Sequence, residues 1–97
     1  MAPGANIGDA HALFEPVHGS APKYAGMDKV NPTAEMLAGV MMLEYLGWPD
    51  AGERLRNAVR AVVASKVVTY DLARQMPGAR SVGTTAFAQA IVDAVNR

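Results

Sequence analysis

The 97-residue sequence predicts a mainly helical unit with about three helices and one or two short strands. The first observation is that apolar residues recur at helical spacing in three stretches, each preceded by residues that commonly cap helices. The second is a pair of short segments, one apolar and one β-branched, that favour strands. The third is a hydrophobic fraction of 51%, which is enough for a core. A chain of this length buries at best about 60–70% of its unfolded surface.

The first half is predicted to contain a loop, a strand and a long helix. Residues 3–8 have the glycine-rich composition of a loop, and a short apolar strand is expected at about 12–17. The helix begins with Asn31 as its N-cap and Pro32 at its first helical position. It ends at Gly47, a residue type that commonly follows a helix C-terminus.

The helix expected at 32–46 is apolar around nearly its whole circumference, with Glu35 and Glu44 as its only charged residues. Such a helix must be buried on several sides. We therefore expect self-association through this helix, or packing against a missing part of a larger parent protein. Its methionines are interpreted as core residues and not as a metal or cofactor site.

A second helix is predicted after Trp48-Pro49. Asp50 is its expected N-cap, and Glu53 follows three residues later in the pattern of a capping box. The helix is amphipathic and ends near Lys66.

The remaining residues predict an extended segment, a helical turn and a third helix. Residues 67–70 are β-branched and aromatic, which favours extended backbone, and residues 71–74 are expected to form a helical turn. Thr84 or Thr85 is the expected cap of the third helix. The apolar stripe of that helix consists of Phe87, Ala90, Ile91, Ala94 and Val95.

The loop that follows the first strand has the composition of an anion-binding segment. Gly19 tolerates backbone angles that other residues avoid, and Pro22 fixes its own angle, so the chain turns tightly here. Backbone N–H groups, the Ser20 hydroxyl and the Lys23 cation would suit an anionic ligand. From chemistry alone, an ordinary surface loop with one lysine remains the alternative.

Several motifs in this region resemble one family of enzymes. Glu15-Pro-Val-His-Gly-Ser-Ala-Pro, Ala25-Gly26 and Asn31-Pro32 resemble the cofactor loop of the β-decarboxylating dehydrogenases, which include isocitrate, isopropylmalate and tartrate dehydrogenases. Lys23-Tyr24, together with Tyr70 and Arg74, resembles the NADP-dependent isocitrate dehydrogenase branch of bacterial type. NAD-dependent members tend to carry an acidic residue followed by Ile at the positions of Lys23-Tyr24.

The resemblance covers essentially the whole chain and implies an α/β fold for the complete enzyme. It implies that residues 1–97 are a single C-terminal segment of the large domain and contain no complete catalytic domain. The complete enzyme would be an oxidoreductase of the tricarboxylic acid cycle.

The resemblance also assigns residues to the adenosine end of the cofactor. His18 would lie against the ribose and adenine, and Gly19 and Ser20 would help hold the diphosphate. Val30 and Asn31 would flank the base, with Asn31 hydrogen-bonding its edge.

Four further residues would hold the 2′-phosphate that distinguishes NADP from NAD. The resemblance assigns this role to Lys23, Tyr24, Tyr70 and Arg74. The chemistry is consistent, because a phosphate dianion is well held by a guanidinium, an ammonium and phenolic donors. Tyr70 and Arg74 are four residues apart, so a helical turn would place both on one face.

The catalytic part of the family pattern is missing from this chain. The reaction implied is hydride transfer from C2 of isocitrate to NADP, followed by β-decarboxylation to 2-oxoglutarate with Mg or Mn. The metal-binding carboxylates, the substrate arginines and the Tyr/Lys acid–base pair all lie upstream of the matching segment. Asp9, Glu15 and Asp28 have no metal-ligand spacing, and no G-x-G-x-x-G opens a βαβ unit. No catalytic or metal residue is therefore assigned, and the isolated chain is expected to be inactive.

Three functions stay open at this point. The chain could be a segment of an NADP-dependent isocitrate dehydrogenase. It could instead be a truncated stand-alone nucleotide-binding or oligomerisation module, or a structural remnant without a ligand that folds only as an oligomer.

Composition limits the partners. The formal net charge is zero, with −4 on residues 1–50 and +4 on residues 51–97. The positive charges lack interleaved aromatic residues, so nucleic-acid binding is not expected. No signal peptide or membrane-spanning run is recognised, and a cytoplasmic location is the expectation. The absence of cysteine excludes disulfides and thiolate metal sites.

Overall fold

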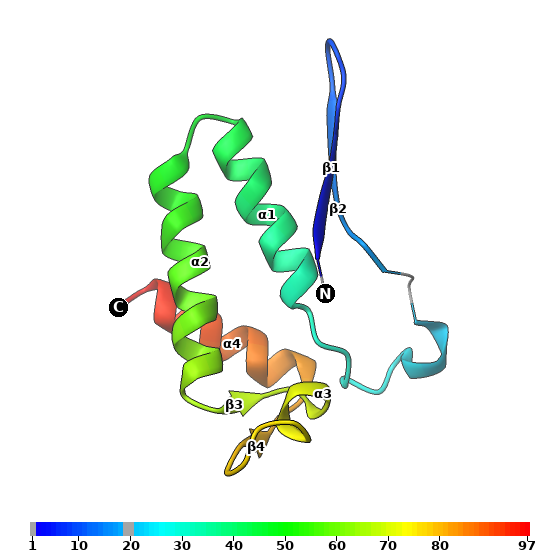
Figure 1. The fold of residues 1–97 in the computed structure, drawn as a ribbon, viewed down its shortest axis with the longest axis vertical. Helices are drawn as coiled ribbons and strands as arrows, with labels where there is room; N and C mark the ends of the chain where they lie inside the picture. The colour runs from blue at the N-terminus through cyan, green and yellow to red at the C-terminus, as the bar shows by residue number, and fades with distance from the viewer. Residues whose placement is uncertain (1, 19–20) are drawn as a thin grey trace.

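The computed structural model describes residues 2–18 and 21–97 as a mainly helical unit with two small sheets (Figure 1). In chain order, its elements are β1 (Pro3–Ile7), β2 (Ala12–Pro16), the 3₁₀ helix η1 (Pro22–Tyr24), α1 (Thr33–Tyr45), α2 (Pro49–Ala64), β3 (Val67–Val68), α3 (Tyr70–Ala73), β4 (Arg80–Ser81) and α4 (Thr84–Val95). The expected fold class is confirmed. The helical turn predicted at residues 71–74 is present as the short helix α3, which brings the α-helices of the described residues to four.

Strands β1 and β2 form an antiparallel hairpin that projects beyond the helices (Figure 1). Its register runs from Pro3 opposite Pro16 to Ile7 opposite Ala12, and the Gly8 N–H donates to the His11 carbonyl at 2.7 Å across the turn. The prediction of a loop at residues 3–8 was therefore wrong. The local composition has little strand preference, and backbone pairing with β2 supplies the missing stabilisation.

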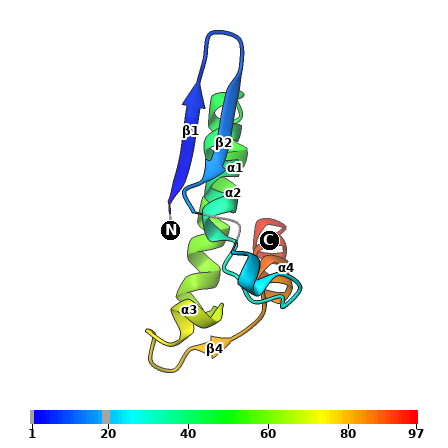
Figure 2. The ribbon, with the colours of Figure 1, turned by 90° about the vertical axis from the view of Figure 1, so that its right-hand side faces the viewer.

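Helix α1 lies between α2 on one side and the hairpin on the other (Figures 1 and 2). This placement buries Ala34, Ala38 and Val40. The Phe14 ring of the hairpin packs against the Tyr45 ring with centroids 5.6 Å apart. The hairpin thus covers a second face of the all-round apolar helix. The end of the helix stays open, with Met42 and Tyr45 41% and 51% exposed.

The ends of α1 follow the predictions closely but not completely. Pro32 occupies the cap position and not the first helical position, while the Asn31 Oδ1 accepts a hydrogen bond from the Thr33 N–H at 2.9 Å. At the other end, the N–H groups of Gly47 and Trp48 donate to the carbonyls of Glu44 and Leu43. With φ of +88° at Gly47, these bonds form a Schellman cap.

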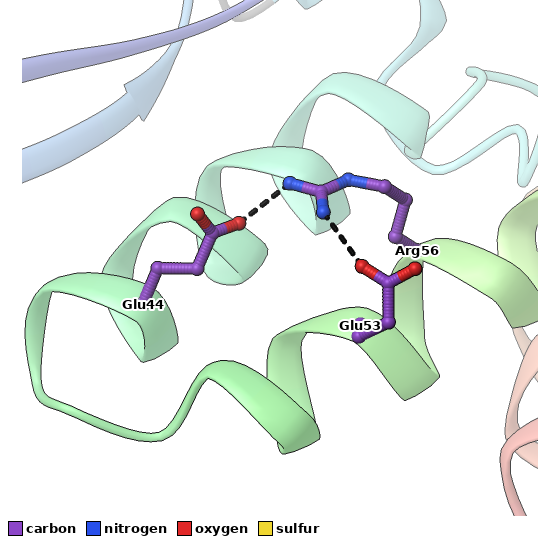
Figure 3. A network of polar contacts seen from close by, with 3 residues as sticks. All are labelled: Glu44, Glu53 and Arg56. Atoms are coloured by element: carbon purple, nitrogen blue, oxygen red, sulfur yellow. Dashed lines mark hydrogen bonds and ion pairs between the residues drawn. The ribbon is translucent and has the colours of Figure 1, made fainter.

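Helix α2 begins two residues earlier than predicted, with Trp48 at the cap position and Pro49 as its first residue. Asp50 was therefore the wrong N-cap, because proline is well suited to the first helical position and moves the start forward. Glu53 does not close a capping box. It receives a hydrogen bond from Arg56 Nη1 at 3.0 Å instead, and Arg56 Nη2 reaches Glu44 Oε1 on α1 at 2.5 Å (Figure 3). Arg56 thus joins the two helices.

The core lies between α2, β3 and α4. Its buried residues are Ala58, Val59, Val62, Val68, Phe87 and Ile91. Strands β3 and β4 pair in parallel beneath it, with Val67 opposite Arg80 and Val68 opposite Ser81. The extended segment predicted at 67–70 is shorter than expected, because Tyr70 already begins α3.

The start of α4 is capped by a residue from a distant loop. Asp28 accepts the Thr84 N–H through its backbone carbonyl at 3.0 Å. Its Oδ1 accepts both the Thr85 N–H at 2.8 Å and the Thr85 hydroxyl at 2.7 Å. We call these three bonds the Asp28 latch. The prediction that Thr84 or Thr85 caps the helix was wrong, since Gly83 holds the cap position.

The molecule is less compact than a typical domain of its size. Its radius of gyration is 14.2 Å, whereas about 12–13 Å is usual for 97 residues. The projecting hairpin accounts for the difference in shape (Figure 2). Among the described residues, no helix has the length and apolar character that crossing a bilayer requires.

Candidate functional site

A pocket of about 400 Å³ opens where the loop after β2 meets α3. It is lined by His18, Ala21, Tyr24, Val30, Asn31, Tyr70 and Asp71. Its volume lies within the range of small-molecule sites, and the lining combines aromatic rings with a few polar groups. Five of the nine residues assigned from the sequence line it: His18, Tyr24, Val30, Asn31 and Tyr70.

Two tyrosines and two cations of the assigned set lie close together beside the pocket. The rings of Tyr24, from η1, and Tyr70, from α3, have centroids 6.1 Å apart. Lys23 Nζ lies 5.6 Å from the Tyr24 centroid, and Arg74 Cζ lies 5.8 Å from the Tyr70 centroid. The four residues assigned to phosphate binding are therefore neighbours in space, although some fifty residues separate the two pairs in the chain.

The helical turn at α3 sets the relative position of Tyr70 and Arg74. The Arg74 N–H donates to the Tyr70 carbonyl at 3.2 Å, which closes one turn of helix and puts both side chains on the same face. The pKa of Tyr70 is raised, chiefly by its hydrogen bond with the Tyr24 phenol and further by burial and by the Asp71 charge. The Tyr70 hydroxyl is therefore protonated at neutral pH. Because a phenol has one O–H, Tyr70 would donate to an anion by giving up its hydrogen bond with Tyr24.

Asn31 and Asp71 form the polar floor of the pocket. Asn31 Nδ2 donates to Asp71 Oδ2 at 3.0 Å, and the Thr69 hydroxyl donates to Asp71 Oδ1 at 2.5 Å. Burial raises the pKa of Asp71, but the hydrogen bonds from Thr69, Asn31 and two backbone N–H groups outweigh it and lower the pKa below its ordinary value. Asp71 is therefore an ionised, fully engaged carboxylate. Asn31 keeps one amide N–H for a ligand.

The remaining assigned residues are His18, Val30, Gly19 and Ser20, and the structure describes the first two of them. His18 is exposed and lines the pocket. Val30 is anchored, since its carbonyl accepts the Thr84 hydroxyl. Gly19 and Ser20 lie outside the described residues, so their assignment stays a prediction.

Sequence reasoning missed three residues of this region. Ala21 and Asp71 line the pocket, and Lys29 Nζ lies 4.5 Å from the Tyr70 centroid and 5.5 Å from that of Tyr24. Lys29 stands two positions before Asn31, so a search for every cation near the assigned loop would have found it. Asp71 gave no signal beyond its place next to Tyr70.

Acidic and histidine side chains do not gather into a metal site in the part of the chain that the structure describes. Within residues 2–18 and 21–97, no group of three or more His, Cys, Asp or Glu side chains is arranged to hold a metal ion.

A family model and individual relatives all match this chain to the same family. Residues 1–91 match the model of the isocitrate/isopropylmalate dehydrogenase family. The chain is 58% identical over 93 residues to isocitrate dehydrogenase [NADP] of Archaeoglobus fulgidus and 54% identical over 93 residues to that of Haloferax volcanii. Each alignment covers 96% of this chain and 22% of the relative.

Solved structures show the same relationship. The crystal structure of isocitrate dehydrogenase from Methylococcus capsulatus superposes with a TM-score of 0.89 at 49% identity, covering 98% of this chain and 27% of that chain. The apo form of a β-decarboxylating dehydrogenase from Thermococcus kodakarensis superposes with a TM-score of 0.83 at 40% identity, covering 97% of this chain and 26% of that one. The chain thus spans about a fifth of the length of its curated relatives, and it belongs to the isocitrate/isopropylmalate dehydrogenase family.

Proposed function

We propose that this chain is a segment of an NADP-dependent isocitrate dehydrogenase and forms the adenosine and 2′-phosphate part of its cofactor site. The observation that carries the proposal is the meeting of Lys23-Tyr24 with Tyr70 and Arg74 beside one pocket. An ammonium, a guanidinium and two phenols from distant segments converge there, and these are suitable groups for a phosphate dianion.

The residues at the pocket fit an adenosine 2′-phosphate. The pocket of about 400 Å³ offers aromatic rings and the apolar Val30 side chain to a flat base. Asn31 has one remaining amide N–H for the base edge, and His18 stands at the rim for the ribose. Gly19 and Ser20 are assigned to the diphosphate from sequence alone.

The complete enzyme would catalyse oxidative decarboxylation of isocitrate to 2-oxoglutarate. NADP would supply the hydride acceptor, and this chain's residues would bind and orient its adenosine end. Mg or Mn would be bound by other parts of the enzyme, and the isolated chain would have no turnover. We infer a cytoplasmic enzyme of the tricarboxylic acid cycle, with no nucleic-acid or membrane partner.

Calorimetric titration with NADP and with NAD tests the cofactor assignment. We expect the chain to bind NADP measurably and NAD at least tenfold more weakly, because one charge-assisted hydrogen bond is worth about 1.5–3 kcal/mol. Arg74→Met should remove most of this preference. Arg80→Met is the matched control, because Arg80 is also an exposed arginine but lies on β4, whereas Arg74 lies over the Tyr70 ring. Equal affinities for the two nucleotides, or no binding of either, would contradict the proposal.

Exposed apolar residues favour a second role as an association surface. Met42, Tyr45, Leu46 and Trp48 are 41–62% exposed around the end of α1, and Ile7 and Leu13 are each 57% exposed on the hairpin. Large apolar side chains exposed in this number are typical of interfaces in soluble proteins. We infer that this face contacts a second copy of the chain or the remainder of the parent enzyme. Sedimentation velocity should show concentration-dependent association, whereas a clean monomer at high micromolar concentration would argue against it.

A further inference from the structure

Lys29 occupies a position that the cofactor assignment does not use. Its Nζ lies over the Tyr70 ring, 4.5 Å from the centroid, and 5.5 Å from the centroid of the Tyr24 ring. The distance to Tyr70 is shorter than that of Arg74, whose Cζ is 5.8 Å away. Lys29 is therefore in contact with both phenol rings of the assigned phosphate site.

The backbone on both sides of Lys29 is fixed. Asp28, the residue before it, is held by the Asp28 latch to Thr84 and Thr85. Val30, the residue after it, accepts the Thr84 hydroxyl with its carbonyl. Since both neighbours are tied to the start of α4, the Lys29 side chain extends from an anchored point and is itself half-buried.

The charge at this place is unbalanced. Lys23 lies 5.6 Å from the Tyr24 ring centroid and Arg74 lies 5.8 Å from that of Tyr70, while Lys29 lies close to both rings. In the part of the chain that the structure describes, the side-chain ion pairs are those of Arg56 with Glu44 and Glu53, so none involves these three cations. Asp71 is the carboxylate that lines the pocket, and its two oxygens already accept hydrogen bonds from Asn31 and Thr69.

Three cations without an ion pair, arranged around two phenols, form a site for a multiply charged anion. We propose that Lys29 is a third cation of the phosphate site and a specificity residue for NADP over NAD, acting directly on the 2′-phosphate. This inference rests on the proposed cofactor function. It adds a residue to the Lys23, Tyr24, Tyr70 and Arg74 set that the sequence assigned.

Titration calorimetry of four variants of the chain tests the inference. Lys29→Met removes the charge and keeps much of the side-chain length, and Lys29→Arg keeps the charge. Arg60→Met is the control for net charge, because Arg60 is an exposed residue of α2, whereas Lys29 lies over the two tyrosine rings. Asp28→Ala disrupts the latch while leaving the lysine in place. NADP and NAD are the probes, each at low and at moderate ionic strength.

We expect Lys29→Met to weaken NADP binding about tenfold or more, to leave NAD binding within twofold, and to reduce the salt dependence of NADP binding. Lys29→Arg should keep most of the preference for NADP over NAD, and Arg60→Met should keep all of that preference. Asp28→Ala should lose part of the NADP affinity that Lys29→Met loses, since it frees the anchored segment.

The contradicting results are distinguishable from one another. If Lys29→Met keeps its NADP affinity, the inference is wrong and the proposed function stands. If the variant loses NADP and NAD affinity equally, Lys29 stabilises the pocket without contacting the 2′-phosphate. The inference is then wrong as well. If the unmodified chain shows no preference for NADP, the proposed function fails and the role of Lys29 fails with it.

Discussion

Replacement of Gly83 by alanine tests whether the Asp28 latch holds the cofactor loop on the fold. Gly83 precedes α4 with φ of −78°, a backbone conformation that alanine adopts without strain. A Cβ added there would lie 2.6 Å from the Asp28 carbonyl oxygen and 2.7 Å from its Oδ2. The effect of Gly83→Ala is therefore steric and is confined to the latch.

The size of the effect follows from the geometry. Asp28 must retreat by about 0.4–0.8 Å before the new contact relaxes to an acceptable distance, and a retreat of this size lengthens and weakens the 3.0 Å bond from the Thr84 N–H. Overpacking of this kind costs about 1–3 kcal/mol. In a chain of this length, each kcal/mol lowers the melting temperature by about 4–8 °C. The loop that carries Lys29, Val30 and Asn31 should loosen at the same time, which weakens NADP binding.

Gly39→Ala is the matched control. Gly39 lies inside α1, and a Cβ added there meets nothing within 4 Å. Alanine should therefore raise the free energy of unfolding by about 0.5–1 kcal/mol, the usual gain in a helix interior. Thermal unfolding followed by circular dichroism measures both variants. If Gly83→Ala melts at or above the temperature of the unmodified chain, the latch does not bear on stability and the reasoning is refuted.

The remaining predictions concern the core, the pH dependence and the helix–helix ion pair. Phe87→Ala removes a fully buried ring and should cost about 3–5 kcal/mol, enough to abolish cooperative unfolding in urea, whereas Phe87→Leu should keep a transition. Hydrogen bonds from the Thr85 hydroxyl and, second, from its backbone N–H lower the pKa of Asp28 below its ordinary value of 3.8. The stabilisation of the fold by the ionised Asp28 is therefore complete above pH 3.8 and is lost as the pH falls through the lowered pKa. The melting temperature should consequently fall below about pH 4 and fall less steeply in Asp28→Asn; an equal fall in both would exclude this role. Arg56→Met should reduce the salt dependence of stability and cost less than Phe87→Ala, because the Arg56 ion pairs are partly exposed; an equal loss would contradict this.

Features that depend on neighbouring residues could be predicted from the sequence. Gly47 was identified as a helix end, because a positive φ after the last turn strongly favours glycine. The spacing of Tyr70 and Arg74 likewise placed both side chains on one face of a helical turn. The strand near residue 12 and the three long helices were also recognisable from local pattern.

Features that depend on residues distant in the chain could not be predicted from the sequence. The cap of α4 comes from Asp28, more than fifty residues earlier, and a local search for capping residues finds only Thr84 and Thr85. The strand at Pro3–Ile7 exists because β2 pairs with it, and its own composition indicates a loop. The sequence marks Lys29 only as a cation near the assigned loop, and its contact with Tyr70 appears only when α3 packs against that loop.

The most direct test of the account is a map of nucleotide contacts by NMR. The backbone and side-chain amide signals of the ¹⁵N-labelled chain would be followed during titration with NADP and, separately, with NAD. The account predicts that NADP shifts the signals of Tyr24, Lys29, Asn31, Tyr70 and Arg74, and that NAD shifts those of the four phosphate-site residues much less than that of Asn31. Shifts confined to the groove of Arg54, Ala58 and Val95 between α2 and α4, or identical shifts with both nucleotides, would contradict it.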